Sequence, residues 1–435
     1  MDGAITRFLE IKPTNHNASF SYNEGRPIIS FQISEQEAIL LPRSVRFCGS
    51  LSVYKNTDRD PVLPADTLKM DSRLGVFSCI DQLVISAGRS KQTIEHLKHA
   101  NRFYSTFFPT TADEKSLLTA YGNTGLTLPS ISAQKTSVVQ EPATGTNNAG
   151  EFCIHLGSGV MSGTSTLPLS GQSGVGGLQI DIHLSPSSAV LFDNDGDASG
   201  NNYLGAFYEL SNCKLVCEVA QSTGAPTSSG GGQLQYNSFS GYYQTINSTN
   251  ADINFPLGLS KVNSVFMNFI DSRYLNNLNY NSMSTLIPTT SAGAIADLSQ
   301  VIFTKGGMRY PLDYNIDTIY KRDNNQTQVD PQVIRNGMNA VIPFNKITHT
   351  SMSPVNVNKD WSSTDNSILG GGLNYIVGVA YDTVGSDTAG GNFMNDAWGV
   401  QMDIGLTDDN PVSAFIYVHA KQTLMFKGGE VQVIM

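Results

Sequence analysis

The sequence predicts an all-β protein in which two β-sandwich domains follow one another along the chain. Apolar and polar residues alternate with a period of two in many short runs, which is typical of strands that bury one face. A Ser- and Gly-rich stretch over 222–232 divides the chain near its middle. The same strand-and-turn pattern occurs on both sides of this stretch. With 435 residues, the chain is long enough to bury two cores.

The repeated pattern is an apolar strand that runs into a glycine turn. In the first half, residues 83–85 lead into the turn at 87–89, and in the second half residues 301–303 lead into the turn at 305–309. The copies lie roughly two hundred residues apart, which is too far for a solenoid repeat and fits a duplicated domain. A duplicated β-domain without a catalytic motif indicates an architectural protein.

The first predicted domain covers residues 25–221 and follows an N-terminal arm, residues 1–24. The arm combines a short amphipathic piece with Pro13 and several Asn residues, and we expect it to pack on another surface such as a neighbouring subunit. Within the domain, the alternation of a half-buried sheet is clearest over residues 29–33, 45–53 and 178–184.

One segment of this domain has a different period. Residues 93–108 place apolar side chains at helical spacing, and Pro109 follows them, so we predict a helix that ends there. Residues 109–150 are rich in Thr, Gly and Asn, and we predict a long surface insertion.

A flexible Ser/Gly linker is predicted over 222–236, and the second domain over 237–435. Strand patterns restart beyond the linker, and stretches rich in Ser, Thr, Gly and Asp at 280–296 and 380–396 are predicted to be long loops.

Composition limits the class of protein and its partners. Charged residues make up 15% of the chain and apolar residues 40%, which fits folded β-domains with polar loops and argues against a disordered chain. The net charge is −10 and Lys and Arg form no run, so we expect no direct sequence-specific binding of nucleic acid. The start of the chain shows no signal-peptide pattern, and no apolar run reaches the roughly 20 residues of a membrane-spanning helix. We therefore expect synthesis in the cytoplasm.

The cysteines are odd in number and occur in apolar, strand-like contexts. We interpret them as small buried hydrophobic residues rather than disulfide partners, which implies a reducing compartment for assembly. They are Cys48, Cys79, Cys153, Cys213 and Cys217.

Two clusters merit consideration as metal sites. The alternating acids Asp193, Asp195 and Asp197 resemble a calcium loop, but Ala198 and Leu204 stand where an EF-hand needs Gly and Glu. A solvated loop is the favoured interpretation, and a structural cation stays open.

The other cluster is His96 and His99 beside Glu95, on the predicted helix. The spacing provides no third ligand, so a solvent-facing helix edge is favoured. Nucleophile-elbow, P-loop and dinucleotide-binding motifs are absent from the sequence. We therefore assign no catalytic, cofactor-binding or metal-binding residue, and expect a protein that is not an enzyme.

The order of these segments resembles the double jelly-roll major capsid proteins of icosahedral DNA viruses, especially those of virophages, polinton-like viruses and adintoviruses. The resemblance covers nearly the whole chain, through the stretches 28–33, 40–44, 77–86, 178–191, 255–259 and 303–311.

The resemblance implies two tandem eight-stranded jelly-roll β-sandwiches with short helices and long loop insertions. It also implies a homotrimer with six similar lobes, which forms a pseudo-hexagonal capsomer and tiles an icosahedral shell. The expected partners are neighbouring capsomers, penton proteins and minor capsid proteins. The expected location is the virion, after synthesis in the host cytoplasm. Whether a membrane lies beneath the shell is left open.

Two alternatives come from other classes of protein. A carbohydrate- or receptor-binding adhesin or spike would use exposed aromatic side chains such as Tyr242, Tyr243 and Trp361 to stack on sugars. A β-sandwich glycoside hydrolase or lyase would need two carboxylates that face a cleft, and no such pair stands out in the sequence.

Overall fold

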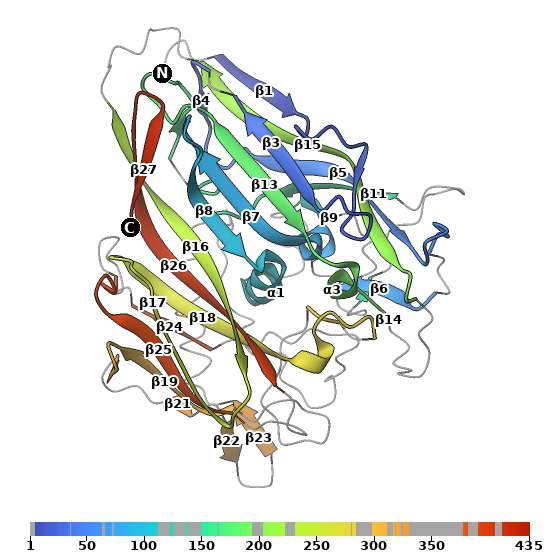
Figure 1. Ribbon diagram of the computed structural model, residues 1–435, viewed down its shortest axis with the longest axis vertical. Coiled ribbons are helices and arrows are strands. Elements are labelled where there is room, and N and C mark those ends of the chain that lie inside the picture. Colours follow the sequence, from blue (N-terminus) through green and yellow to red (C-terminus); the bar gives the residue numbers. More distant parts are fainter. Residues whose placement is uncertain are drawn as a thin grey trace.

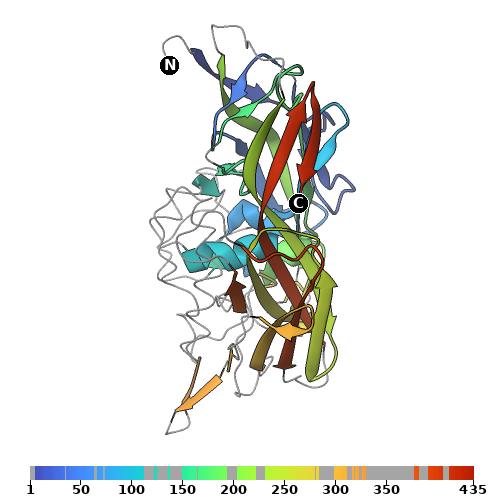
Figure 2. The same cartoon turned by 90° about the vertical axis from the view of Figure 1, so that its left-hand side faces the viewer.

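The chain forms two β-sandwiches that lie side by side, the first at the upper right and the second at the lower left of Figure 1, with the helix α1 (Ala100–Thr111) between them (Figures 1 and 2). The computed structural model describes residues 5–34, 36–62, 66–71, 74–111, 122–124, 136–137, 149–163, 165–193, 203–221, 231–279, 281–283, 298–310, 316–317, 319–322, 326–329, 377–381, 390–404 and 411–435.

The first sandwich consists of two main sheets. The larger has the strand order β12-β4-β15-β5-β11-β9, and β1 and β2 also pair with β15. Its strands are β1 (Ile5–Ile11), β2 (Ser19–Phe20), β4 (Ile39–Leu40), β5 (Arg46–Tyr54), β9 (Gly122–Thr124), β11 (Ala149–His155), β12 (Leu167–Pro168) and β15 (Phe207–Gln221). The facing sheet has the order β3-β13-β7-β8. Its strands are β3 (Ile28–Ile33), β7 (Ile80–Ala87), β8 (Gln92–Lys98) and β13 (Leu178–Leu184).

Shorter elements complete this half. A small sheet of order β10-β6-β14 lies near two single-turn helices. These elements are β6 (Leu68–Asp71), β10 (Thr136–Ser137), β14 (Leu191–Asp193), η1 (Gly75–Cys79) and α3 (Ser187–Val190).

The second sandwich also pairs two sheets. One has the order β16-β26-β18-β24, with β27 on β26, and the other has the order β17-β25-β19-β20, with β21 on β19. The strands are β16 (Gly232–Ile246), β17 (Asn250–Pro256), β18 (Val262–Asp271), β19 (Leu298–Lys305), β20 (Met308–Arg309), β21 (Ile316–Asp317), β24 (Val377–Ala380), β25 (Ala397–Ile404), β26 (Val412–Lys427) and β27 (Glu430–Ile434). The remaining elements are η2 (Ser272–Tyr274) and the hairpin β22 (Ile319–Arg322) with β23 (Gln326–Val329).

The two sandwiches have the same strand connectivity. In the first, β1-β15-β5-β11 faces β3-β13-β7-β8, and in the second, β16-β26-β18-β24 faces β17-β25-β19-β20. Matched in chain order, the eight strands of one half occupy the same sheet positions as the eight of the other. This eight-stranded, two-sheet arrangement is the jelly roll. The predicted all-β class and the tandem jelly rolls are thus confirmed.

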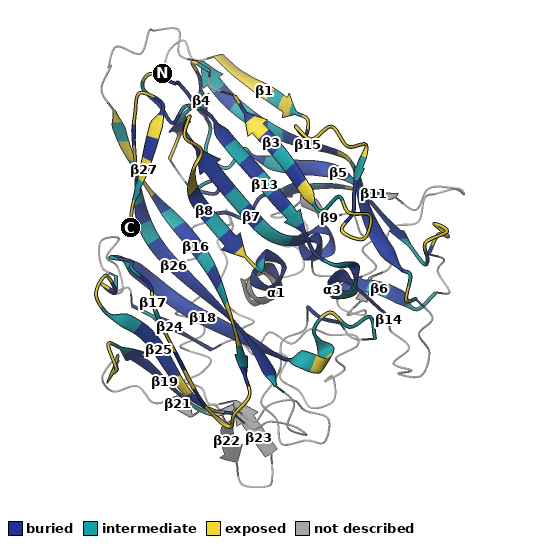
Figure 3. Cartoon of the chain, in the orientation of Figure 1, coloured by how far each residue is buried: buried dark blue, intermediate teal, exposed yellow. Residues whose placement is uncertain are grey.

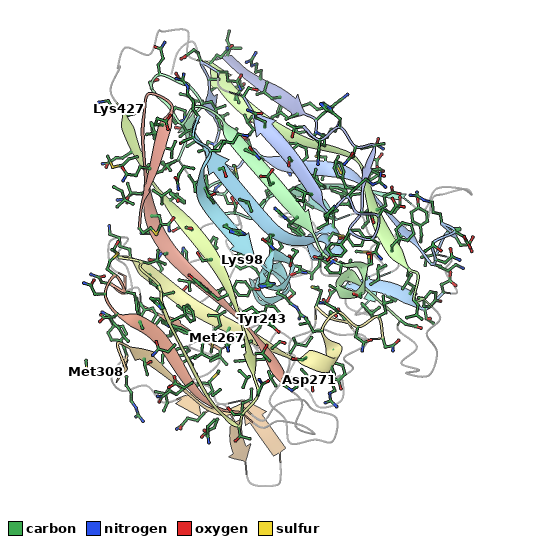
Figure 4. The ribbon with its side chains drawn as sticks, viewed as in Figure 1. Lys98, Tyr243, Met267, Asp271, Met308 and Lys427 are labelled. Carbon is green, nitrogen blue, oxygen red and sulfur yellow. The ribbon has the colours of Figure 1, made fainter. Side chains whose placement is uncertain are left out.

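The repeated strand-and-turn pattern corresponds to one equivalent hairpin in each sandwich. β7 turns at Gly88 into β8, and β19 turns at Gly306 and Gly307 into β20. All three glycines have positive φ, a backbone conformation that is unstrained for glycine but sterically unfavourable for residues with a Cβ atom. Met308, just after the second turn, is exposed at the left side of the second sandwich in Figure 4.

Burial follows the alternation predicted from the sequence, except at the contact between the sandwiches. In β13, Leu178, Ile180, Ile182 and Leu184 are buried and the residues between them are half-buried. β18, by contrast, is buried at every position. One of its faces packs in its own sandwich and the other packs toward α1, so β18 has no solvent face (Figure 3).

The N-terminal segment is not the separate arm expected for residues 1–24. Residues 5–11 form β1, which pairs antiparallel with β15 over its whole length and occupies the position that β16 has in the second sandwich. The physical reason is the open edge of β15, whose N–H and C=O groups need partners. Because β1 is an edge strand, Ile5 and Phe8 are exposed, and the strand lacks a clear alternation of buried apolar and exposed polar residues.

The helix predicted over 93–108 is only partly correct. Residues 92–98 form the strand β8 on β7, and the helix begins at Ala100, after His99 with φ of 53°. The pairing shifts register at Ile94, which lies as an extra residue between Thr93 and Glu95. A bulge of this kind adds one residue to the strand and shifts the alternation of buried and exposed side chains by one position. The buried Ile94 and Leu97 are therefore three residues apart, a spacing that also occurs in helices.

Two further boundaries change. The helix α1 continues to Thr111, past Pro109. The linker predicted over 222–236 is shorter, because β16 begins at Gly232 and pairs with β26 from that residue on. The predicted loop at 280–296 lies outside the described residues except for 281–283, and the predicted loop at 380–396 is described at both ends but not over 382–389.

Candidate functional site: the junction between the two sandwiches

The junction between the sandwiches is centred on Phe103 of α1. Its ring centroid lies 5.3 Å from that of Phe239, 5.5 Å from Tyr417 and 6.1 Å from Phe266. These three rings belong to β16, β26 and β18 of the second sandwich. Phe103 is 3% exposed, and the buried apolar residues of the two halves form one continuous cluster. The helix therefore joins the two cores into one.

Hydrogen bonds from tyrosines fix how the halves meet. The Tyr417 hydroxyl donates to the backbone oxygen of His99 at 2.9 Å. The Tyr236 hydroxyl lies 2.7 Å from the backbone oxygen of Ile94 and 2.7 Å from Oε1 of Gln422. Both tyrosine side chains are buried, where a hydrogen bond to a fixed carbonyl specifies one relative position. In Figure 4, Lys98 at the end of β8 and Tyr243 on β16 mark the two sides of this contact.

The carboxylate of Glu95 connects three segments at the junction. Oε1 accepts from the backbone N–H of Gly159 at 2.8 Å, and Oε2 accepts from that of Val160 at 3.0 Å. The backbone of Phe239, in the second sandwich, also bonds to it. Burial raises the pKa of Glu95 to about 7, although the hydrogen bonds from Val160, Gly159 and Phe239 favour the charged form and lower it.

We predict that Glu95 makes the stability of the protein depend on pH. Because the pKa is raised from 4.5 to about 7 on folding, the folded protein binds more protons than the unfolded chain between these values. The contribution of Glu95 to stability is therefore complete below pH 4.5 and falls as the pH rises through 7, by about 3 kcal/mol. The variant Glu95→Gln lacks this titration. Thermal unfolding at pH 5 and pH 8 should show wild type losing stability relative to the variant; parallel curves would contradict the assignment.

The C-terminal hairpin makes a second contact between the halves. At the turn between β26 and β27, the backbone oxygen of Gly429 accepts from the N–H of Arg89 at 3.0 Å, and the N–H of Gly428 donates to the oxygen of Gln172 at 3.3 Å. Arg89 lies in the turn that follows β7. The glycine turn at Gly88 in the first sandwich thus contacts the second sandwich through Arg89.

The residues singled out as metal ligands do not converge. His96 lies on β8 with Nε2 3.0 Å from Oε1 of Gln82, and His99 packs against Phe415. Glu95 is directed into the junction instead. The described residues contain no group of three or more His, Cys, Asp or Glu side chains able to hold a metal ion. Asp193 ends β14 and is buried, whereas 194–197 lie outside the described residues, so the cation loop is not placed.

The aromatic residues of the adhesin alternative form no exposed platform in the described part of the chain. Tyr242 is half-buried, with its ring centroid 4.6 Å from that of Phe255. Tyr243 is 43% exposed, but its hydroxyl is 3.1 Å from the Ser413 hydroxyl and its ring packs on Phe415. Trp361 lies outside the described residues.

An open hollow lies beside the turn between β26 and β27, where β16 begins. It is lined by Gly231, Gly232, Gln233, Met425, Phe426, Lys427, Glu430, Val431 and Gln432. Among the described residues of this lining, Glu430 is the one carboxylate, so they do not provide the pair that glycoside hydrolysis requires.

Sequence reasoning missed the junction as a site. The signal was present in β18 and β26, where apolar residues stand on both faces of the strand, for example Val265, Phe266 and Met267 in succession. A strand buried on both faces needs a second covering layer, and here the first sandwich provides it.

Two eight-stranded jelly rolls in one chain, joined through a shared core, define a double jelly-roll protein. Among solved structures, the PBCV-1 virus capsid has this fold, with a TM-score of 0.55, 10% identity and coverage of 100% of this chain and 97% of that chain. The Sputnik virophage structure matches with a TM-score of 0.54, 12% identity and coverage of 100% and 89%. The mavirus major capsid protein matches with a TM-score of 0.51, 8% identity and coverage of 98% and 90%.

No protein-family model matches the chain, and no curated protein matches it by sequence. The fold is nevertheless that of the double jelly-roll major capsid proteins, so the resemblance seen in the sequence is confirmed at the level of the fold.

Proposed function

We propose that the chain is a viral major capsid protein with a structural, non-enzymatic role. The observation that carries the proposal is the pair of sandwiches with one connectivity, fused by the buried contacts of Phe103 and Glu95. A rigid pair of similar lobes is what a pseudo-hexagonal tile requires, since three copies present six similar lobes around one axis. The fold match over nearly the full length of capsid structures supports the same role.

In this proposal three chains form a homotrimeric capsomer, and capsomers tile an icosahedral shell together with penton and minor capsid proteins. The proposal divides the two units between the end of β15 at Gln221 and the start of β16 at Gly232. Such a shell derives its stability from many modest interfaces repeated by symmetry. The acidic net charge of −10 fits a shell that makes no direct sequence-specific contact with nucleic acid. Within the described residues, no helix has the length and apolar character to cross a membrane.

The exposed edge of β1 is the surface we expect to contribute to assembly. Phe8 is 75% exposed and Ile5 64% exposed, and among the described strands β1 pairs only with β15, so its other edge has no strand partner there. Exposed apolar side chains beside an open edge are costly in a monomer, and a neighbouring subunit would cover them.

Light scattering coupled to size-exclusion chromatography tests the trimer. The chain has a mass of 46.9 kDa, and we expect a species of three times that mass at high protein concentration. Phe8→Asp should weaken the contacts that β1 makes between subunits, while the circular dichroism of the subunit stays unchanged. A species that remains monomeric at every concentration would contradict the proposed capsomer.

A further inference from the structure

Two cysteines lie directly opposite one another on neighbouring strands of the first sandwich. Cys48 of β5 is the register partner of Cys153 of β11, and their Sγ atoms are 2.9 Å apart. Opposed residues of an antiparallel pair have Cα atoms about 4.5–5.5 Å apart, within the range of about 4.4–6.8 Å that disulfides span. The backbone geometry therefore allows a bond between these two sulfurs without displacement of either strand.

The surroundings of this pair differ from those of the other cysteines. The Cys153 side chain is half-buried and Cys48 is 8% exposed, on the polar outer face of the sheet. Lys214 of β15 is the register partner of Cys48 on its other side, and Arg46 lies two residues before it on the same face. Two cations beside two thiols favour a thiolate, which is the reactive form.

The titration of the thiols agrees with this arrangement. The hydrogen bond from Cys48 lowers the pKa of Cys153 to about 6, and the charges of Arg46 and Lys214 act in the same direction. The pKa of Cys48, the donor, is raised. Burial raises the pKa of Cys213 to about 12 and that of Cys217 to about 11.

We propose that Cys48 and Cys153 are a redox-active pair that forms a reversible disulfide by exchange with a small oxidised disulfide such as oxidised glutathione. The Cys153 thiolate attacks one sulfur of the small disulfide, forms a mixed disulfide and releases one thiolate. The Cys48 thiol then loses its proton and attacks the Cys153 sulfur, which releases the second thiolate. One disulfide is reduced and one is formed, and the protons of the two protein thiols end on the two released thiols.

The bond would link β5 to β11 across a sequence separation of 105 residues. A cross-link over a long loop restricts the unfolded chain and stabilises the folded one. Chains made under reducing conditions would thus gain stability once they meet an oxidising medium. This inference does not depend on the proposed capsid role.

The test uses the full chain in buffers of reduced and oxidised glutathione, followed by alkylation of free thiols and peptide mass spectrometry. Two of the five thiols should become protected, a linked peptide should contain Cys48 and Cys153, and reductant should reverse both changes. The thermal midpoint of the oxidised protein should exceed that of the reduced protein by several degrees.

Two variants distinguish disulfide formation between Cys48 and Cys153 from unspecific oxidation of any thiol. Cys48→Ser should form no internal disulfide, should collect one glutathione on Cys153, and should lose the difference between oxidised and reduced midpoints. Cys217→Ala, which removes a buried thiol outside the pair, should keep both effects. Five free thiols in the oxidised wild type, or a linked peptide that contains Cys79, Cys213 or Cys217, would overturn the proposal.

Discussion

Replacement of Phe103 by Ala is expected to lower the free energy of unfolding by about 3–5 kcal/mol, the range for a buried aromatic residue truncated to alanine. The side chain is 3% exposed and its ring lies among rings from three strands of the second sandwich, so truncation leaves a cavity in the shared core. Differential scanning calorimetry should show a lower midpoint. Because the lost contacts join the halves, the transition should also separate into two steps.

Two variants control this result. Phe103→Leu keeps an apolar side chain in the same space and should lower the midpoint far less. Phe8→Ala removes an aromatic ring that is 75% exposed, and it should leave the midpoint of the unassembled subunit nearly unchanged. A Phe103→Ala protein that unfolds in one step at the wild-type midpoint would contradict the shared core.

The second large effect is expected from Gly159→Ala. A Cβ atom at this position would lie 1.7 Å from the backbone oxygen of Asn237 in β16, and no rotation of a side chain relieves a clash with backbone. The loop that follows β11 would have to move away from the second sandwich. That movement would also break the hydrogen bond from Gly159 to Glu95. We expect a loss of about 3 kcal/mol or more, at the upper end for overpacked sites.

Gly163→Ala provides a matched control in the same loop. Its nearest neighbour would be the oxygen of Gly159 at 3.4 Å, an ordinary contact. The two variants should be compared by thermal unfolding and by yield of soluble protein. Equal stability of both would show that the loop and β16 are not in close contact.

Much of the fold is encoded in local patterns that a reader of the sequence can follow. The alternation in residues 178–184 predicted β13 because a strand with one buried face repeats every two residues. The glycine turns at Gly88 and Gly306 marked equivalent hairpins in the two halves, since both require positive φ.

Other features depend on contacts that no local pattern reports. The bulge at Ile94 made a strand look helical, because one extra residue changes the spacing of buried positions from two to three. The weakly patterned β1 is a strand only because β15 offers it an edge.

The candidate site was the least predictable part. The sequence pattern predicts a solvent-facing position for Glu95 beside His96, whereas its carboxylate is buried at the junction. The partners that determine this role, Gly159 and Phe239, are 64 and more residues away in the chain. The pairing of Cys48 with Cys153 likewise depends on sheet register rather than on sequence spacing.

Electron microscopy of the expressed protein tests the central claim most directly. If each chain is a rigid pair of like sandwiches that assembles in threes, averaged images should show a six-lobed particle with a threefold axis, and sheets or shells built from it at high concentration. Particles with a single lobe per chain, or pairs of lobes that vary freely in relative orientation, would contradict the account.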